Sequence, residues 1–408
     1  MKGSILIGQS GGPTSVINAS LAGCITAAIS SEKIENVYGA INGIYGVLNH
    51  QIIDLRKEDL ETIELLKNTP GSILGSVRYK LKDFKIDDTD YKKIKCVFES
   101  LNIKYFIYIG GNDSMDTCNK ISKYFESINF DCNVIGVPKT VDNDLVETDH
   151  TPGYGSSIKY IANVIAEIYQ DISCYIKGKV TIVEIMGRDA GWLTAGAKLA
   201  SLVNNGADLI YLPESPFDMD EFLNKVNNIY KEKQHALIAI SEGIKDKDGK
   251  YILEYRPTSS TDAFGHLQLG GAAQVLSEYV SSKLNLPNRS IELNLPQRCS
   301  SHIASLTDID EAFNCGYYGV QYVLSNTDKM ISMKRSAESY KIDYQIIDLS
   351  KVANQVKRVP EEYITNNGSN ISDDFIKYAL PLINNEPNIK FENGLQKFAK
   401  LKKEYIKL

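Results

Sequence analysis

One short segment, Pro-Lys-Thr-Val-Asp-Asn-Asp at residues 138–144, combines the side chains needed to move a phosphoryl group onto a hydroxyl. Lys139 offers a positive charge for a phosphate, and an aspartate can accept the proton of the attacking hydroxyl. We expect Asp142 to be that base and Asp144 to orient the attacking group or a metal ion. Thr140 can donate to a phosphate or hydroxyl of the substrate. The alternative interpretation is a structural turn rich in Asp and Asn.

Two glycine-rich loops precede this segment, each between an apolar run and a helical pattern. Residues 8–14 read Gly-Gln-Ser-Gly-Gly-Pro-Thr, and residues 110–114 read Gly-Gly-Asn-Asp-Ser. Glycine lets the backbone approach a phosphate, and the start of the following helix supplies N–H donors. The second loop also offers a polar group that can help to hold Mg²⁺. A tight turn explains the first loop equally well, and helix capping by Asn112, Asp113 and Ser114 explains much of the second.

A further loop, Met-Gly-Arg-Asp-Ala-Gly-Trp at residues 186–192, follows another apolar run. Gly187 permits close approach of a ligand to the backbone. Arg188 presents a planar fork for a phosphate or a sugar hydroxyl. Trp192 is the only tryptophan of the chain, and we interpret it as a packing residue rather than a stacking platform.

The loops follow short apolar runs that alternate with longer helical patterns. This order predicts parallel sheets covered by helices on both faces, with ligands beyond the carboxyl ends of the strands. The expected strands are 4–7, 37–40, 105–109, 134–137, 180–185, 209–212, 236–240 and 290–293. The expected helices are 15–29, 115–125, 156–171, 190–202, 218–231, 265–284 and 308–324.

The composition limits the possible classes of protein. With 408 residues, the chain exceeds what one hydrophobic core usually supports, so we expect two domains. Its 45 basic and 51 acidic residues give a formal charge of −6 without a long basic block, which argues against nucleic acid as a partner. We expect no signal peptide, and no apolar run approaches the roughly 20 residues of a membrane span. The seven scattered cysteines have no metal-ligand spacing, so we expect reduced thiols in the cytoplasm.

The motifs in this order resemble the phosphofructokinase family. The resemblance includes the first glycine pair, the three motifs above and Ser-Glu-Gly at residues 241–243, and it covers residues 2 to about 335. It implies two Rossmann-like αβα domains, to which this chain adds a C-terminal helical cap. The implied donor domain is 1–139 with about 298–349. The implied sugar-phosphate domain is 140–297, with the cap at about 350–408.

The resemblance also implies roles in phosphorylating the 1-hydroxyl of fructose 6-phosphate. Asp142 would be the base, and Lys139, Asp144 and Arg188 would be the other catalytic residues. The residues implied to bind the sugar phosphate are Thr140, Asp142, Met186, Gly187, Arg188, Glu242, Arg289 and Arg298. The residues implied to face the donor are Gly11, Gly12, Gly111, Asn112, Asp113 and Lys139, and those implied to hold Mg²⁺ are Asn112 and Asp144. Because Arg289 would reach across from a neighbouring subunit, a homodimer or homotetramer is implied.

Two positions bear on the donor. Members that use ATP resemble Gly-Gly-Asp-Gly-Ser and Pro-Gly-Thr-Ile-Asp-Asn-Asp, and this chain has Asp113 and Lys139 in place of two of those glycines. Asp113 would add bulk and negative charge where the α-phosphate of ATP would lie, and Lys139 would supply a point charge for a free terminal phosphate. We therefore expect the pyrophosphate-dependent branch, with reversible formation of fructose 1,6-bisphosphate and phosphate. The alternatives are an ATP-dependent 6-phosphofructokinase and a non-catalytic regulatory subunit that binds sugar phosphate.

Some positions depart from the family pattern. Asn112 stands where an aspartate often helps to hold Mg²⁺. Lys179 stands where bacterial ATP enzymes usually have an arginine from a neighbouring subunit, and Leu295 replaces a histidine of those enzymes. The segment 262–271 is extra relative to the short ATP enzymes, and for its His266 we favour a structural role.

Overall fold

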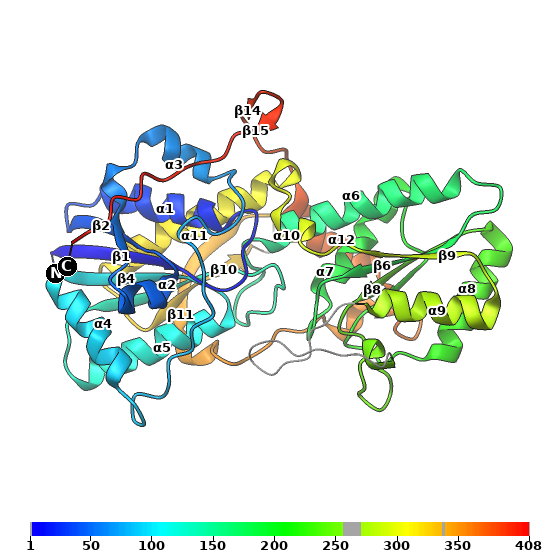
Figure 1. The fold of residues 1–408 in the computed structure, drawn as a ribbon, viewed down its shortest axis with the longest axis horizontal. Helices are drawn as coiled ribbons and strands as arrows, with labels where there is room; N and C mark the ends of the chain where they lie inside the picture. The colour runs from blue at the N-terminus through cyan, green and yellow to red at the C-terminus, as the bar shows by residue number, and fades with distance from the viewer. Residues whose placement is uncertain (1, 256–270, 337–338, 408) are drawn as a thin grey trace.

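The computed structural model describes residues 2–255, 271–336 and 339–407. In these residues the strands form two main sheets. The strands of the large sheet are β1 (Gly3–Gln9), β2 (Ile34–Ala40), β3 (Ile52–Asp54), β4 (Ile103–Gly110), β5 (Asn133–Pro138), β10 (Lys329–Arg335) and β11 (Ile342–Asp348). The strands of the small sheet are β6 (Val180–Ile185), β7 (Leu209–Tyr211), β8 (Ala236–Ser241) and β9 (Asn288–Glu292). The two sheets lie in opposite halves of an elongated molecule (Figure 1).

The large sheet has the order β11-β10-β5-β4-β1-β2-β3, and its central strands are parallel. Alternate side chains of β1 enter different cores, because successive residues of a strand point to opposite faces. Ile5 and Ile7 belong to the core with helices α1 (Ile17–Ile29) and α11 (Leu306–Val323). Leu6 belongs to the core with α2 (Gly43–Leu48), α4 (Thr89–Ser100) and α5 (Asn112–Ser127). Helices therefore cover both faces.

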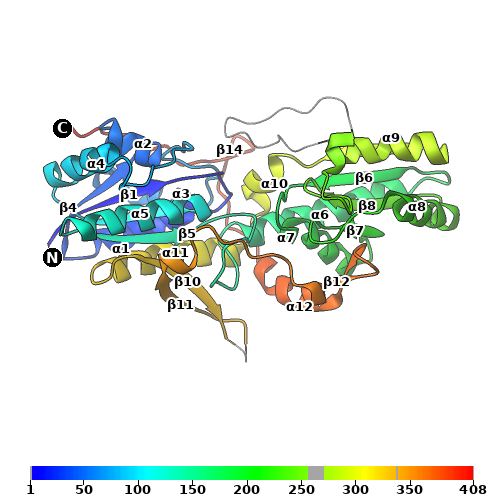
Figure 2. The same ribbon diagram turned by 90° about the horizontal axis from the view of Figure 1, so that it is seen from below.

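The small sheet is parallel throughout, in the order β7-β8-β6-β9, and is also covered on both faces. One core contains α6 (Tyr154–Ser173), α7 (Trp192–Ala195) and α12 (Asp373–Ala379), and the other contains α8 (Met219–Lys233) and α9 (Ala272–Leu284). Figure 2 shows α6 and α12 beside this sheet. The expectation of two αβα units is confirmed.

Several elements differ from the sequence-based expectation. Strands β3, β10 and β11 and helix α4 were not predicted. Strand β10, Lys-Met-Ile-Ser-Met-Lys-Arg, has only one β-branched residue, which explains its weak strand signal. The helix expected at 190–202 is only the single turn of α7 followed by a 3-10 stretch at Gly196–Val203. The start of the helix expected at 265–284 and most of the extra segment 262–271, including His266, lie outside the described residues.

The chain passes between the two halves more than once. It leaves the large sheet after β5, returns before α11 and leaves again after β11 (Figure 1). These crossings lie near the expected boundaries, and the division into two domains stays our proposal.

The C-terminal tail differs from the helical cap that we expected on the second domain. Only α12 and short 3-10 turns are helical, and a small hairpin of β14 (Phe391–Glu392) and β15 (Leu395–Gln396) follows. Residues 399–407 return to the large sheet, where Asp54 N donates to Glu404 O at 3.0 Å and Ile406 N donates to Ile52 O at 2.8 Å. The reason is that β3 is an edge strand whose free backbone groups the tail satisfies.

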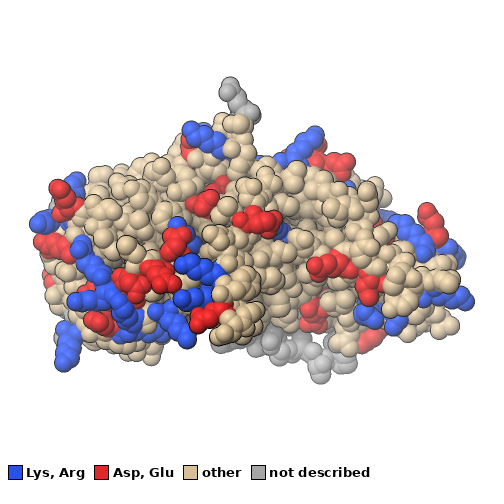
Figure 3. Space-filling model, turned by 90° about the horizontal axis from the view of Figure 1, so that it is seen from above, with Lys and Arg blue, Asp and Glu red and all other residues tan. Residues whose placement is uncertain are grey.

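No helix in the described part of the chain is long and apolar enough to cross a membrane. On the face drawn in Figure 3, basic and acidic side chains are interspersed over both halves. That face therefore presents no broad surface of a single sign for a polyanionic partner.

A buried histidine of the loop after β5 contacts α11. The Nδ1 atom of His150 is 2.8 Å from Asp149 Oδ1, and its Nε2 atom is 2.6 Å from Glu311 Oε2. Arg335 Nη2 donates to the same Asp149 oxygen at 2.8 Å, and Tyr340 donates to Glu311 Oε1 at 2.6 Å. Burial lowers the pKa of His150, but the carboxylates of Glu311 and Asp149 outweigh it and raise the pKa to about 9.

This raised pKa predicts a pH-dependent stability. The folded protein holds the proton of His150 more tightly than the unfolded chain, so its contribution is complete below the unfolded pKa near 6.5 and is lost as the pH rises through about 9. As the pH rises through that window, we expect the free energy of unfolding to fall by about 3 kcal/mol because the stabilising proton on His150 is lost. Urea unfolding of the native protein and of His150→Gln measures this, and an equally steep loss in the variant would contradict the assignment.

Candidate active site

The predicted functional loops follow strands of both sheets at their carboxyl ends. Segments 10–14 and 139–144 follow β1 and β5, Gly111 and the first turn of α5 follow β4, and segments 186–191 and 242–243 follow β6 and β8. This is where parallel sheets bind ligands. Contacts between the loops bring most of the predicted residues together.

Lys139 lies at the centre of the donor loops. Its side chain is buried, and Nζ donates to Gly12 O at 2.7 Å. A Cβ atom on Gly11 would lie 3.2 Å from Nζ, and the φ of +78° at Gly11 is a left-handed conformation that favours glycine. Burial lowers the pKa of Lys139 to about 8, although the charges of Asp142 and Asp144 oppose this.

Asp142 is held by its own loop. Its backbone N donates to Thr140 Oγ1 at 3.1 Å, and that hydroxyl is 3.3 Å from Asp142 Oδ2. Burial raises the pKa of Asp142, whereas the hydroxyl of Thr140 and the charges of Lys139 and Arg298 lower it. A carboxylate next to two cations and with a raised pKa is suited to accept a proton.

Asp144 is a candidate metal ligand. Burial and the neighbouring charge of Asp142 raise its pKa to about 7. Its Oδ1 atom is buried and has no hydrogen-bond partner among the described residues. Those residues contain no cluster of three His, Cys, Asp or Glu side chains that could hold a metal ion. Mg²⁺ commonly binds through one or two carboxylates together with substrate phosphates, so an unsatisfied oxygen at Asp144 fits that ion.

Asn112, the other predicted metal ligand, is used differently. Its Oδ1 atom accepts from Asn354 N at 2.8 Å, and its Nδ2 atom donates to Gln355 O. Both polar atoms of the amide thus hold the chain after β11, because α5 begins beside that segment. Asp113 is exposed on the first turn of α5. Gly111 does lie at the centre, since a Cβ atom there would be 3.4 Å from Lys139 O.

The loops that follow the strands of the small sheet are hydrogen-bonded to their neighbours. Gly187 N donates to Glu242 Oε1 at 3.2 Å, and Met186 N donates to Gln297 Oε1 at 3.2 Å. Burial raises the pKa of Glu242, and the charge of Asp142 adds to this, whereas the charge of Arg188 opposes it. The carboxylates of the two halves therefore lie close enough to interact.

Arg298 connects the donor and sugar loops. A Cβ atom on Gly12 would lie 3.3 Å from its Nη1 atom. Its charge also lowers the pKa of Asp142 and of Glu242. Arg298 thus lies near the donor loop at Gly12, and its charge acts on the carboxylates of Asp142 and Glu242.

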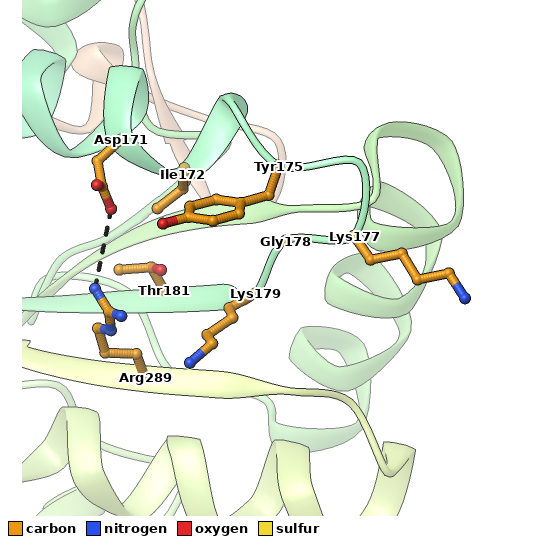
Figure 4. Close-up of a pocket in the computed structure, with 8 residues that line it drawn as sticks. All are labelled: Asp171, Ile172, Tyr175, Lys177, Gly178, Lys179, Thr181 and Arg289. Atoms are coloured by element: carbon orange, nitrogen blue, oxygen red, sulfur yellow. Dashed lines mark ion pairs between the residues drawn. The ribbon is translucent and has the colours of Figure 1, made fainter.

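Arg289 is the one predicted residue that lies elsewhere. It pairs with Thr181 near the start of β6, whereas Met186 follows the end of β6. The five steps along the chain from Thr181 to Met186 span about 16 Å, which is beyond the reach of an arginine side chain. Arg289 instead lines a cavity of about 190 Å³ with Lys177 and Lys179, and its Nη1 atom is 4.0 Å from Asp171 Oδ2 (Figure 4).

Sequence reasoning missed several residues that build the site. The side chain of Gln297 accepts a hydrogen bond from Met186 N, and the backbone N of Lys357 donates to Asp144 O. The charge of Asp189 raises the pKa of Asp142. Asp189 belongs to the loop 186–192, and Gln297 directly precedes Arg298 in the sequence. Lys357 lies in a tail without any recognisable motif.

Comparison with known proteins agrees with this arrangement. The phosphofructokinase family model matches residues 4–288. A protein of Halomonas elongata named pyrophosphate–fructose 6-phosphate 1-phosphotransferase is 40% identical over 98% of this chain and 96% of its own length. A protein of the same name from Xanthomonas campestris is 38% identical, with the same coverage of both chains.

A solved structure gives the same result. The pyrophosphate-dependent phosphofructokinase of Nitrosospira multiformis superposes with a TM-score of 0.91 at 36% identity, covering 100% of this chain and 98% of its own. The motifs, the paired αβα units and these matches along nearly the whole length lead to one conclusion: the chain belongs to the phosphofructokinase family.

Proposed function

We propose that this protein transfers a phosphoryl group from inorganic pyrophosphate to the 1-hydroxyl of fructose 6-phosphate, forming fructose 1,6-bisphosphate and phosphate. The observation that carries this proposal is the place of the Lys139 ammonium, between Gly11, Gly12 and the carboxylate of Asp142. A compact cation at that point meets the terminal phosphate of a small donor and lies beside the base.

Each residue of the site has a role in the proposed reaction that follows from its position. Asp142 accepts the proton of the 1-hydroxyl as the oxygen attacks phosphorus. Lys139 and Arg298 neutralise charge on the transferring group, because both act electrostatically on Asp142 in a largely buried setting. Asp144 would hold Mg²⁺, which when bound supplies further positive charge to the phosphates. Glu242 and the backbone of 186–188 would orient the sugar.

The choice of donor follows from Lys139 and Asp113. Asp113 is exposed on the first turn of α5, beside the donor glycines. A negative side chain there repels the additional phosphate of a nucleotide more than it affects a diphosphate bound deeper in the site. The names of the relatives from H. elongata and X. campestris support the same donor.

Arg289 supports an assembly of at least two subunits. Together with Lys179 it forms a basic cavity that its own Asp142 cannot use. We propose that these side chains complete the sugar-phosphate site of a neighbouring copy in a homodimer or homotetramer. We place the reaction in the cytoplasm, because the seven cysteines are unpaired, as expected of reduced thiols in that compartment.

The reverse reaction tests the proposal. The pyrophosphate bond stores less free energy than the ATP step, so fructose 1,6-bisphosphate and inorganic phosphate should yield fructose 6-phosphate and pyrophosphate. Phosphorus NMR of the mixture with Mg²⁺ follows each species. Formation of pyrophosphate supports the proposal, and hydrolysis of the bisphosphate without pyrophosphate would contradict it.

Gly243 offers a test of the sugar side. A Cβ atom at this position would lie 2.0 Å from Arg188 O, which is backbone and cannot rotate away. Gly243→Ala should therefore displace the Arg188 loop and lower kcat/KM for fructose 6-phosphate by about 100-fold. Gly249→Ala is the control for lost stability, because its φ of +80° strains alanine while the added Cβ atom meets nothing within 4 Å. A KM for fructose 6-phosphate that is the same in the Gly243 variant and the native enzyme would argue against this role of the loop.

A further inference from the structure

Residues 354–359, here named the crossing segment, connect the two halves of the molecule. The segment follows β11 and leads to the turn before β12 (Ile364–Thr365). Figures 1 and 2 show the chain passing here from the large-sheet half to the small-sheet half. Its contacts fall on loops that the proposed reaction uses.

The first contact is with the donor loop. Asn354 N donates to Asn112 Oδ1 at 2.8 Å, and Gln355 O accepts from Asn112 Nδ2. Asn112 is the first residue of α5 and follows Gly111 directly. The crossing segment therefore holds the N-terminus of α5, directly after the donor glycines.

The second contact is with the catalytic loop. Lys357 N donates to Asp144 O at 2.8 Å. The Nζ atom of Lys357 donates to Asp149 O at 2.9 Å, to Thr148 O at 3.1 Å and to Asn143 Oδ1 at 3.4 Å. One lysine thus holds the loop on both sides of Asp144.

The third contact is with the small-sheet half. Trp192 Nε1 donates to Lys357 O at 2.9 Å, and Lys357 Nζ lies 5.2 Å from the centre of the Trp192 ring. Glu214 Oε1 accepts from Val359 N and from Gly191 N, each at 2.9 Å. The segment is therefore anchored to the loop that carries Arg188 as well.

These contacts decide the kind of role that Lys357 can have. An ammonium group has three hydrogens to donate, and three oxygen atoms of the loop already lie within 3.4 Å of Nζ. No donor is left for a phosphate. Lys357 therefore differs from Lys139, which faces the donor loops.

We propose that Lys357 is a positioning residue for phosphoryl transfer, which holds the loop of Asp142 and Asp144 in register with the donor loop and the Arg188 loop. This inference rests on the proposed function, because the loop matters only if Asp142 is the base. Glu242 and the backbone of 186–188, which we propose to orient the sugar, lie on other loops, so Lys357 should affect the chemical step far more than the binding of fructose 6-phosphate.

The test compares Lys357→Met with the native full-length protein. Methionine keeps most of the apolar stem and removes the three donated hydrogen bonds. We expect kcat with pyrophosphate to fall by about 30-fold in both directions, since small misplacements of reacting groups have effects of this order. The KM for fructose 6-phosphate should stay within about threefold of the native value. Lys351→Met, at an exposed lysine six residues earlier, should leave both constants unchanged.

Folding is measured in the same samples. Trp192, the only tryptophan, lies against Lys357, so its emission should shift in Lys357→Met while the far-ultraviolet circular dichroism stays native. A folded variant with a lower melting temperature and an unchanged kcat would overturn the proposal, because Lys357 would then serve stability alone. If Lys357→Met does not fold, Lys357→Gln replaces it. Failure of both to fold would overturn the proposal for the same reason. If the native protein itself has no activity with pyrophosphate, the proposed function fails instead.

Discussion

Asp142→Asn is expected to lower kcat by about 1,000-fold with pyrophosphate as donor, in both directions of the reaction. Asparagine has nearly the same shape but cannot accept the proton of the 1-hydroxyl. The hydrogen bonds with Thr140 can persist, so the KM for fructose 6-phosphate should change much less than kcat. Steady-state kinetics of the purified variant measures both constants.

The control for this variant is Asp343→Asn, an exposed carboxylate on β11 that should leave turnover unchanged. A kcat for Asp142→Asn within tenfold of the native value would contradict the assignment of the base. That result would hold whichever donor the enzyme uses.

Lys139→Met should lower kcat/KM for pyrophosphate by about 100-fold or more, because it removes a preorganised charge from the transferring group. The native ammonium is buried and lies 2.7 Å from Gly12 O, so solvent cannot replace it fully. Pyrophosphate titrations at saturating fructose 6-phosphate measure the effect, and Lys93→Met, at an exposed position of α4, is the matched control.

The Lys139→Met variant also distinguishes a role of Lys139 in binding the donor from a role in the stability of the fold. Its melting temperature should not fall, since burial lowers the pKa of Lys139 and methionine avoids the burial of a charge. A variant that binds and turns over pyrophosphate like the native enzyme would show that Lys139 does not hold the donor.

The sequence was sufficient for the parts of the site that local patterns encode. Each glycine loop stands between an apolar strand and a helix, and that order is enough to place Gly11 and Gly111 at the carboxyl ends of parallel strands. Asp142 follows from the same reasoning, because its loop comes directly after β5.

The parts that the sequence did not reveal depend on contacts between distant residues. Asn112 was expected to hold a metal ion, but its amide hydrogen bonds to residues 354 and 355, more than 240 positions later. No local pattern predicts that the chain after β11 passes there, since β10 and β11 were themselves not predicted. The sequence did not indicate a role for Lys357 either, because that role depends on the packing of the tail against the loop of Asp144.

The measurement that tests the central claim most directly is a coupled assay of fructose 1,6-bisphosphate formation with fructose 6-phosphate, Mg²⁺ and either pyrophosphate or ATP. With the cation of Lys139 beside Asp142 and the carboxylate of Asp113 at the donor loop, we predict turnover with pyrophosphate and none with ATP. Turnover with ATP but not with pyrophosphate would contradict the account of the donor pocket.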